Sequence, residues 1–469
     1  MRRALWLSLW VLSECAMAAS SGEPPRVAEP SVLRLSQAWR LALQNDPGYL
    51  AALSERDAGQ ANRAIGRAGL LPQVNAYVGR TKVHGTLETP GACGTACTDL
   101  DYISRINEIR ATQTVFNWSR IAEYRQGHAR ADYSLAVFDT RAEDSSIRLV
   151  NRYFQALLTD ENRRLMQSKL QANEKQVNIA QRRYEAGEGI IPDVREALSR
   201  RDLARADVIQ SDDAYIVAMR ELQEMIGYAP ARLVPLARDF KPQPLTPASI
   251  QEWLALAVTG NPEIRAAQEN LRVADHEIDR VFGGHLPSLE LVVARRNVDA
   301  ETISTRDQSS NTTAVGIELA VPIYSGGLVS AQVDQARHTH AGLAQELAAT
   351  RERIEVEVTR QYQAVVTGAR RIEALVQAVA SSDEAFKATE TGYRLGTRSI
   401  SDVLDAEDRV YQSRLDLTRA RLEYTLAHLS LSAAAGRLDA ALIERIDEAC
   451  FDPENARQAV AAIGRDARR

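Results

Sequence analysis

One segment of the chain occurs twice, and this duplication is the feature that most limits the possible folds. The stretch YEAGEGIIPDV, which begins at Tyr184, has a counterpart in YRLGTRSISDV, which begins at Tyr393. Two further pairs of stretches repeat in the same order, NDPGYLAA with GNPEIRAA and GLLPQV with GHLPSL. We therefore expect two copies of one unit, each built as helix, strand, strand, very long helix, tight turn and long helix.

A cluster of prolines separates the two copies. The prolines stand at positions 230, 235, 242, 244 and 247, and no continuous helix tolerates such a series. The predicted organisation is a signal peptide (1–18), a first repeat (19–229), a Pro-rich linker (230–247), a second repeat (248–440) and a C-terminal tail (441–469).

Composition and motifs argue against several classes of protein. The 469 residues carry a net charge of -5 without a basic segment, which makes nucleic acid an unsuitable partner. Aromatic residues make up only 6% of the chain, and the abundant alanine, leucine, arginine and glutamate favour long helices. The GxSxG, HExxH, P-loop and dinucleotide-binding fingerprints are absent, so we predict neither enzyme activity nor a cofactor.

The N-terminal residues predict export from the cytoplasm. Two arginines precede a short apolar run that ends in Ala16-Met17-Ala18, which is typical of a signal peptide cleaved after Ala18. Cys15 invites a lipoprotein interpretation, but Glu14 stands where a lipobox needs a small residue. Beyond the signal there is no apolar run of about 18 residues, so any membrane crossing is expected to use strands.

The cysteines fit an exported protein. Cys93 and Cys97 lie in a glycine-rich loop, where we expect a small disulfide rather than a metal site, since no second pair of Cys or His lies nearby. Cys450 is left over and is expected to remain a free thiol.

Four segments show the alternation typical of strands: PQVNAYVGRTKV with DYISRINEIRATQTVFN, and PSLELVVARRNV with TTAVGIELAVPIY. In the last, Val315, Ile317 and Leu319 share one face while Gly316 and Glu318 share the other. At about ten residues the strands suit a tilted transmembrane barrel, although a soluble hairpin has the same period. Four strands cannot close a barrel alone, so three copies would give about twelve strands and two copies about eight.

The runs that follow each strand pair, residues 119–184 and 328–393, contain no proline. Each is about 65 residues long, or about 100 Å as a helix. Apolar residues three and four apart predict a coiled-coil seam. The seam positions are Val365, Ala369, Ile372, Val376, Val379, Phe386 and Tyr393, followed on the returning helix by Val403, Val410, Leu417, Tyr424 and Leu431.

Paired strands followed by a long antiparallel helical hairpin, all repeated, resemble the TolC family of outer-membrane channels. The resemblance covers residues 33–438 and is carried by YRLGTRSISDVLDAE, YEAGEGIIPDV, the NDP and GNP turns, and VPIYSGG. It implies a homotrimer with a twelve-stranded barrel in the outer membrane, a helical tunnel through the periplasm and a periplasmic C-terminal tail. It also implies two partners, a periplasmic adaptor protein and an inner-membrane pump.

The duplicated tips contain the candidate site residues. Gly187 and Gly396 supply turn conformations that are costly for other residues, and Asp193 suits the positive end of the helix that follows. Asp402 and Asp405 are three apart and share one helix face, and the family places its channel constriction ring at the matching positions.

The resemblance also implies a closing latch, in which Tyr393 and Arg398 bind Asp193, and an adaptor that docks on the tip turns. Pro192 stands where the family has a hydroxyl residue, and a plain surface salt bridge remains the alternative to a latch. The tip turns consist of Gly187, Gly189, Gly396 and Thr397.

Two classes of function fit the sequence. The preferred one is an outer-membrane export channel driven by an ABC transporter in type I secretion of a polypeptide. Small-molecule or drug efflux with a proton-driven pump is the alternative channel function. A periplasmic coiled-coil scaffold without a pore is the alternative of a different class. Arg398 and Asp405 do not recur in the first copy, which marks them as candidates for the gate.

Overall fold

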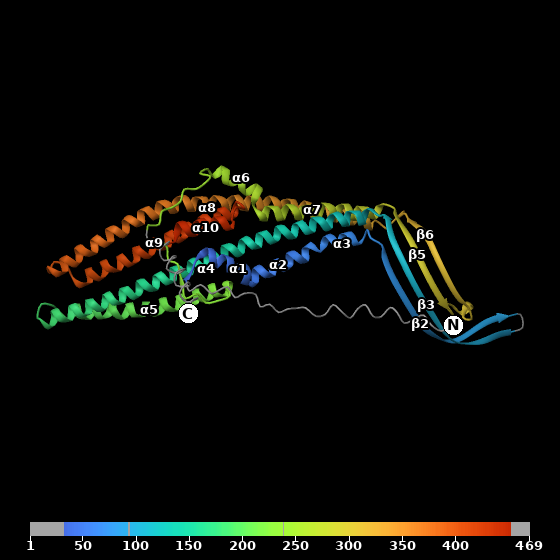
Figure 1. Ribbon diagram of the computed structural model, residues 1–469, viewed down its shortest axis with the longest axis horizontal. Helices are drawn as coiled ribbons and strands as arrows, with labels where there is room; N and C mark the ends of the chain where they lie inside the picture. Colours follow the sequence, from blue (N-terminus) through green and yellow to red (C-terminus); the bar gives the residue numbers. More distant parts are fainter. Residues whose placement is uncertain (1–31, 92–93, 238, 452–469) are drawn as a thin grey trace, which may run out of the picture.

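A computed structural model describes residues 32–91, 94–237 and 239–451. The molecule is strongly elongated: a β-sheet forms one end, two long helical hairpins form the other, and shorter helices lie around the middle and between the middle and the sheet (Figure 1). The signal peptide and Cys93 lie outside the described residues. None of the described helices has the length and apolar character needed to cross a membrane.

The sheet joins the two repeats. Strands β2 (Gln73–Gly91) and β3 (Gly94–Phe116) form one hairpin, and β5 (Ser288–Asp299) and β6 (Ser309–Ala320) form the other. Both hairpins were predicted from the alternation of residues. The strands are hydrogen-bonded in the order β2-β3-β5-β6, all antiparallel, so that β3 and β5 connect the copies.

The first strand pair is longer than the sequence led us to expect. The prediction was about ten residues per strand, but β2 has 19 residues and β3 has 23. The pairing between β2 and β3 continues from Gln73↔Thr112 to Gly91↔Gly94, whereas β5 accompanies β3 only as far as Arg105. The extra length is therefore a two-stranded ribbon that projects beyond the rest of the sheet.

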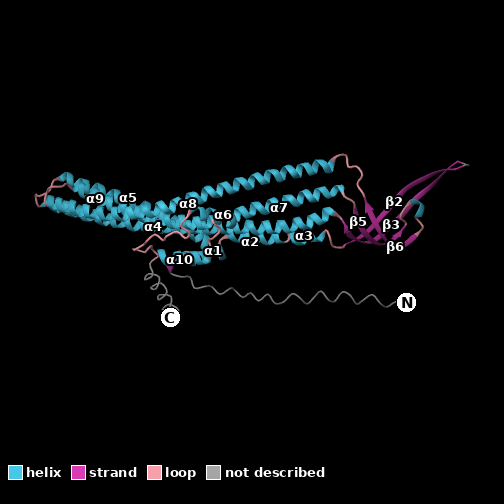
Figure 2. Ribbon diagram, turned by 90° about the horizontal axis from the view of Figure 1, so that it is seen from above, coloured by secondary structure: helices cyan, strands magenta, loops and turns pink. Residues whose placement is uncertain are grey.

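The proline-free runs form the predicted long helices. Helix α4 (Trp118–Glu185) has 68 residues and α8 (Leu328–Arg394) has 67. Each returns along a shorter partner, α5 (Ile191–Ile226) or α9 (Ile400–Ala434), which gives the two hairpins that extend away from the sheet (Figure 2). Because no proline interrupts the hydrogen-bond ladder, each long helix spans from the sheet to a hairpin tip.

The main hydrophobic core lies at the middle of the molecule, where short segments surround the four long helices. Tyr153 of α4 is fully buried there, and its hydroxyl group donates a hydrogen bond to the Leu33 carbonyl. The short helices are α1 (Leu35–Asn45), α2 (Pro47–Gln60), α3 (Asn62–Ala68), α6 (Ile250–Gly260), α7 (Pro262–Phe282) and α10 (Ala440–Cys450), with single 3-10 turns at Gly283–His285 and Ile303–Thr305.

The Pro-rich segment crosses this core without forming a helix. Its only strand among the described residues, β4 (Arg232–Leu233), pairs in parallel with β1 (Val32–Leu33). Tyr424 of α9 donates a hydrogen bond to the Gln243 carbonyl, and Tyr362 of α8 donates one to the Ala248 carbonyl. The segment is thereby held against the second hairpin.

The predicted seam of the second hairpin is largely buried. Val365, Ile372, Val403, Val410 and Leu431 lie in the interior of the single chain, whereas Val376 is 46% exposed.

Two cysteines can be placed. Cys450 is buried at the end of α10, and Cys97 on β3 is exposed. Since Cys93 lies outside the described residues, its disulfide with Cys97 stays a prediction.

Candidate functional site

The two hairpin turns have the same backbone geometry. Gly187 and Gly396 both have φ of 75°, in the left-handed region that favours glycine. The Thr397 amide donates to the Gly392 carbonyl at 2.9 Å, and the equivalent bond in the first tip is also 2.9 Å long. A side chain at Gly189 would lie 3.1 Å from the Tyr184 amide nitrogen, so this position also needs a small residue. The predicted docking residues therefore lie together at each tip.

The helices that leave the two turns begin differently. Helix α9 starts with a capping box, in which the Asp402 amide donates to the Ser399 hydroxyl at 3.1 Å and the Ser399 amide donates to the Asp402 carboxylate at 3.0 Å. This second bond holds the pKa of Asp402 below its usual value. Helix α5 follows Ile190, which makes no side-chain cap, and has Pro192 in its first turn. The predicted constriction aspartate thus also fixes the start of its own helix.

Tyr393 lies in a small core at the second tip. Only 7% of its surface is exposed, and it packs with Ile400, Val403 and Leu404. The Arg183 guanidinium of the first hairpin lies over its ring, 4.7 Å from the centroid. Arg183 also donates a hydrogen bond of 3.4 Å to the Tyr393 carbonyl. Tyr393 therefore connects the two hairpins of one chain through Arg183.

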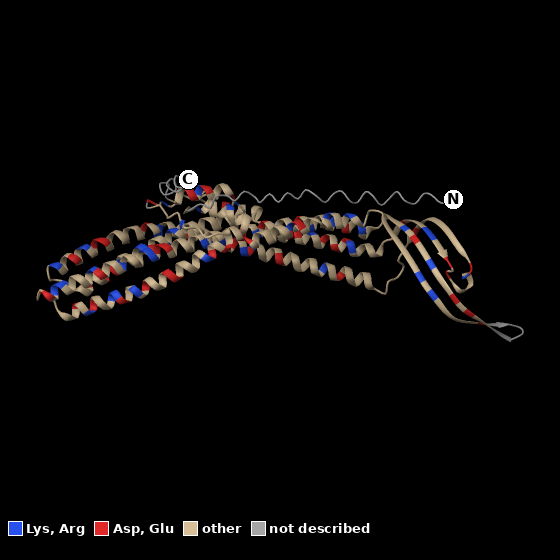
Figure 3. Cartoon of the chain, turned by 60° about the horizontal axis from the view of Figure 1, so that its bottom comes forward, with Lys and Arg blue, Asp and Glu red and all other residues tan. Residues whose placement is uncertain are grey.

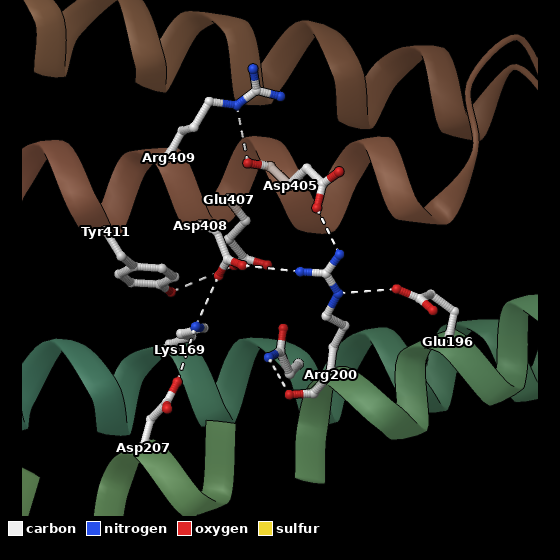
Figure 4. Close-up of polar contacts among 10 residues, drawn as sticks. Lys169, Glu196, Arg200, Asp207, Asp405, Glu407, Asp408, Arg409 and Tyr411 are labelled. Atoms are coloured by element: carbon white, nitrogen blue, oxygen red, sulfur yellow. Dashed lines mark hydrogen bonds and ion pairs between the residues drawn. The ribbon is translucent and has the colours of Figure 1, made fainter. Parts of the chain in front are cut away.

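A second connection between the hairpins centres on Arg200 of α5 (Figure 4). Its guanidinium lies 2.8 Å from Asp405 and 3.4 Å from Asp408 of α9, and its Nε is 3.0 Å from Glu196 of its own helix. One cation thus holds carboxylates from both hairpins, and the hydrogen bond to Glu196 raises its pKa further above the usual range. Asp405 is therefore partly neutralised within its own chain.

Lys169 of α4 extends this cluster along the hairpins. Its ammonium group lies 3.1 Å from Asp408 and 3.3 Å from Asp207 of α5. The Asn173 side chain donates to the Arg200 carbonyl at 3.2 Å and so ties α4 to α5 at the same level. We call Lys169, Glu196, Arg200, Asp405 and Asp408 the charge clamp.

A buried carboxyl group lies beside the charge clamp. Glu407 is only 8% exposed, and its Oε2 atom has no hydrogen-bond partner. Burial, together with the charge of Asp408, raises the pKa of Glu407 to about 7. The Tyr411 hydroxyl group donates to its other oxygen at 3.5 Å, and burial raises the pKa of Tyr411 to about 12.

The structure brings together some of the predicted site residues and separates others. Tyr393, Asp402 and Asp405 lie along one tip, but within the described part of the single chain no ion pair joins Arg398 to Asp193. Arg398 packs instead against Gly392, where an added Cβ would lie 2.8 Å from its Cγ. The predicted latch between Arg398 and Asp193 is thus not formed inside one chain.

Sequence reasoning missed the residues that do join the hairpins. Arg183, Lys169 and Arg200 stand on ordinary helical faces, and each finds its partner more than a hundred residues away or on the returning helix. A signal was available only by comparing the repeats, because Lys169 aligns with Ala378 and Arg183 with Gly392. Among the described residues there is no cluster of His, Cys, Asp and Glu that would hold a metal ion.

Comparison with known proteins agrees with this architecture. The family model "Outer membrane efflux protein" matches residues 38–228 and 253–437, which lie within the two predicted repeats. The chain is 34% identical to the "Proteases secretion protein PrtF" of Dickeya chrysanthemi over 86% of its length and 88% of that protein. It is 31% identical to the "Alkaline protease secretion protein AprF" of Pseudomonas aeruginosa, over 88% and 86% of the two chains.

A solved structure extends the comparison to the fold. The Campylobacter jejuni CmeC outer membrane channel superposes with a TM-score of 0.73 over 90% of both chains, at 14% identity. Such channels are trimers, in which three four-stranded sheets close a twelve-stranded barrel and the helices form a periplasmic tunnel. The predicted trimeric channel fold agrees with these neighbours, and the family description argues against a scaffold without a pore. The chain belongs to the outer membrane efflux protein family.

Proposed function

We propose that this protein is the outer-membrane exit duct of a type I secretion system that exports a polypeptide. The observation that carries the proposal is its similarity to two protease secretion proteins, each matched over more than four fifths of both chains. Those relatives are named for secretion of a protein, whereas the Vibrio cholerae TolC protein, named without a cargo, is 26% identical. Small-molecule efflux is the competing function for the same channel fold.

The proposed partners are an ABC transporter in the inner membrane and a periplasmic adaptor that docks on the hairpin tips. Support for tip docking comes from the apolar side chains that the turns present to solvent. Leu395 is 75% exposed, Ile190 is 59% exposed and Ile191 is 47% exposed, next to the small residues of the turns. Exposed apolar groups beside a glycine turn suit a protein partner rather than water.

The proposed gate lies at the same end. In a trimer, Asp402 and Asp405 form rings of carboxylates around the axis, and Arg398 reaches Asp193 of a neighbouring chain rather than its own. The contact between Arg200 and Asp405 supports a further part of this proposal. Within each chain, the charge clamp holds the two hairpins against each other and so keeps the tip closed. Cation selectivity that is unchanged when both aspartates become alanine would contradict the ring.

Complementation tests the cargo. The protein is expressed in Dickeya chrysanthemi cells that lack PrtF, and extracellular protease activity is measured. We expect secretion to be restored, since the chain aligns with 88% of the length of PrtF at 34% identity. The parallel experiment uses cells that lack their drug-efflux outer-membrane channel. Restored drug resistance without protease secretion would overturn the proposal and favour small-molecule efflux.

A further inference from the structure

The two faces of the sheet differ in polarity. Alternate residues of the four strands form one apolar, solvent-exposed face: Val74, Val78, Ile109, Val293, Val315, Ile317 and Leu319. The opposite face carries the polar side chains of Glu108, Arg110, Arg296 and Glu318. In a closed transmembrane barrel the polar face lines the interior and the apolar face contacts lipid.

Four cations share this lipid-facing side, at the end of the apolar band nearest the strand turns. Arg80 lies opposite Arg105, Lys82 follows two residues further along β2, and Arg295 lies opposite Ile109. Figure 3 shows Lys and Arg in the middle of the strands and acidic residues closer to the tip of the long hairpin. We call Arg80, Lys82, Arg105 and Arg295 the cationic belt.

The belt carries more positive charge than its neighbours neutralise. Arg105 lies 3.0 Å from Asp299, and Lys82 lies 3.3 Å from Asp101. Among the described residues, Arg80 and Arg295 have no ion-pair partner. Two arginines placed directly opposite each other on adjacent strands destabilise a sheet unless anions compensate for them.

The interior face of the sheet has no such excess of unpaired positive charge among the described residues. Arg110 lies 3.6 Å from Glu318, and Arg296 is paired with both Glu108 at 3.6 Å and Glu301 at 2.6 Å. Both arginines of that face therefore have carboxylate partners from the same chain. The missing anions of the lipid-facing side must come from outside the chain.

We propose that the cationic belt binds phosphate groups of phosphorylated lipid headgroups in the outer leaflet of the outer membrane. The strand turns lie at the end opposite the helical hairpins (Figure 1), and the belt lies on the turn side of the apolar band, which places it toward the outer leaflet. Guanidinium groups bind phosphate through two parallel hydrogen bonds, which suits an interfacial site. In the trimer, the belt occurs three times around the barrel.

The first test uses the wild-type trimer alone. It is reconstituted in phosphatidylcholine bilayers that contain either a phosphorylated glycolipid or the same glycolipid after phosphatase treatment, and co-purified glycolipid is quantified by mass spectrometry. We expect retention of the phosphorylated form only. Equal retention of both forms would overturn the proposal. So would thermal stabilisation by inorganic phosphate equal to that by the phosphorylated glycolipid, since the belt would then bind a free ion.

The second test uses matched variants. Arg80→Gln with Arg295→Gln removes the two unpaired belt cations, whereas Arg110→Gln with Arg296→Gln removes two cations from the interior face of the same sheet. We expect roughly tenfold weaker glycolipid retention in the belt variant, since each cation at an anionic surface adds to binding. The interior variant should retain the lipid as the wild type does. Equal retention by the two variants would overturn the proposal, and a trimer band on an unheated gel confirms that each variant folds.

Discussion

The two hairpin tips have the same backbone geometry but differ in charge. Comparing them explains how the two hairpins of one chain are joined. Arg183 and Arg200 of the first hairpin reach across to the second. Their counterparts there are Gly392 and Arg409, and among the described residues the hydrogen bond of the Arg409 side chain goes to a carbonyl of its own helix. The first hairpin thus supplies cations and the second supplies their acceptors. Duplication produced two like surfaces, and divergence made them complementary.

The interiors of the tips differ as well. Where the first copy has Leu198, which packs against a small apolar core, the second has the buried Glu407. An aliphatic side chain stabilises the first coil at every pH, whereas a buried carboxyl group stabilises the second only while it is protonated. The stability of the second tip is therefore expected to fall as pH rises, whereas that of the first tip is not.

The largest effect is expected from the tyrosine pair. Tyr393→Ala removes a buried aromatic ring, and its cost to the local stability of α9 should be about 3 kcal/mol. Tyr184, its counterpart, is 47% exposed, so Tyr184→Ala should change little. Hydrogen exchange of the first turns of α5 and α9 measures both. Equal effects would show that the two tips pack alike.

The next effect concerns Glu407 and pH. Its folded-state pKa of about 7 lies above the ordinary value of 4.5, so the folded tip binds more protons and loses stability as pH rises through this window. Glu407→Gln should remove that loss and stabilise α9 by roughly 2 kcal/mol above the window, with little change below it.

Thermal unfolding of the trimer on both sides of the window measures the pH effect. Glu423→Gln, the same charge change at a side chain that is 53% exposed on the same helix, is the control. If Glu407→Gln raised the thermal stability equally on both sides of the window, titration of Glu407 would be contradicted. An equal increase in thermal stability for Glu423→Gln would contradict it as well.

A smaller effect is expected at the charge clamp. Arg200→Ala leaves Asp405, Asp408 and Glu196 without their shared cation and should favour the open tip by about 1 kcal/mol, or roughly fivefold. Arg201→Ala is the control, since within the described part of the chain Arg201 pairs with the adjacent Asp202 alone. Single-channel conductance in planar bilayers should increase for the first variant alone. Unchanged conductance would mean that the clamp does not hold the tip closed.

The smallest effect concerns the start of each returning helix. Ser399→Ala removes the cap of α9 and should destabilise its first turn by roughly 0.5 kcal/mol, because the tip is solvated. Ile190→Ser introduces the same cap in the first copy and should stabilise α5 by a similar amount. Amide exchange at Asp402 and Asp193 reports both changes. If both substitutions changed the stability of the first helical turn in the same direction, the difference in capping would be refuted.

Much of the architecture was accessible from sequence because it depends on local rules. Absence of proline allowed the long helices, glycine marked the turns at residues 187 and 396, and alternation placed Val315 and Ile317 on one strand face. The family resemblance then supplied the trimer, which strand counting had left undecided. That resemblance also assigned gate and constriction roles to Tyr393, Asp402 and Asp405 at the second tip, and those roles stay predictions.

The contacts that hold the tips together came only from the tertiary structure. Tyr184 and Tyr393 occupy equivalent positions in the two repeats, yet one is exposed and the other is buried, because burial depends on what the opposite hairpin presents. The partners of Arg200 depend on how α5 lies against α9, and the extra length of β2 and β3 depends on pairing beyond the edge of β5. Sequence periodicity determines which residues a helix or strand presents on each face, but only packing between distant segments determines what those faces meet.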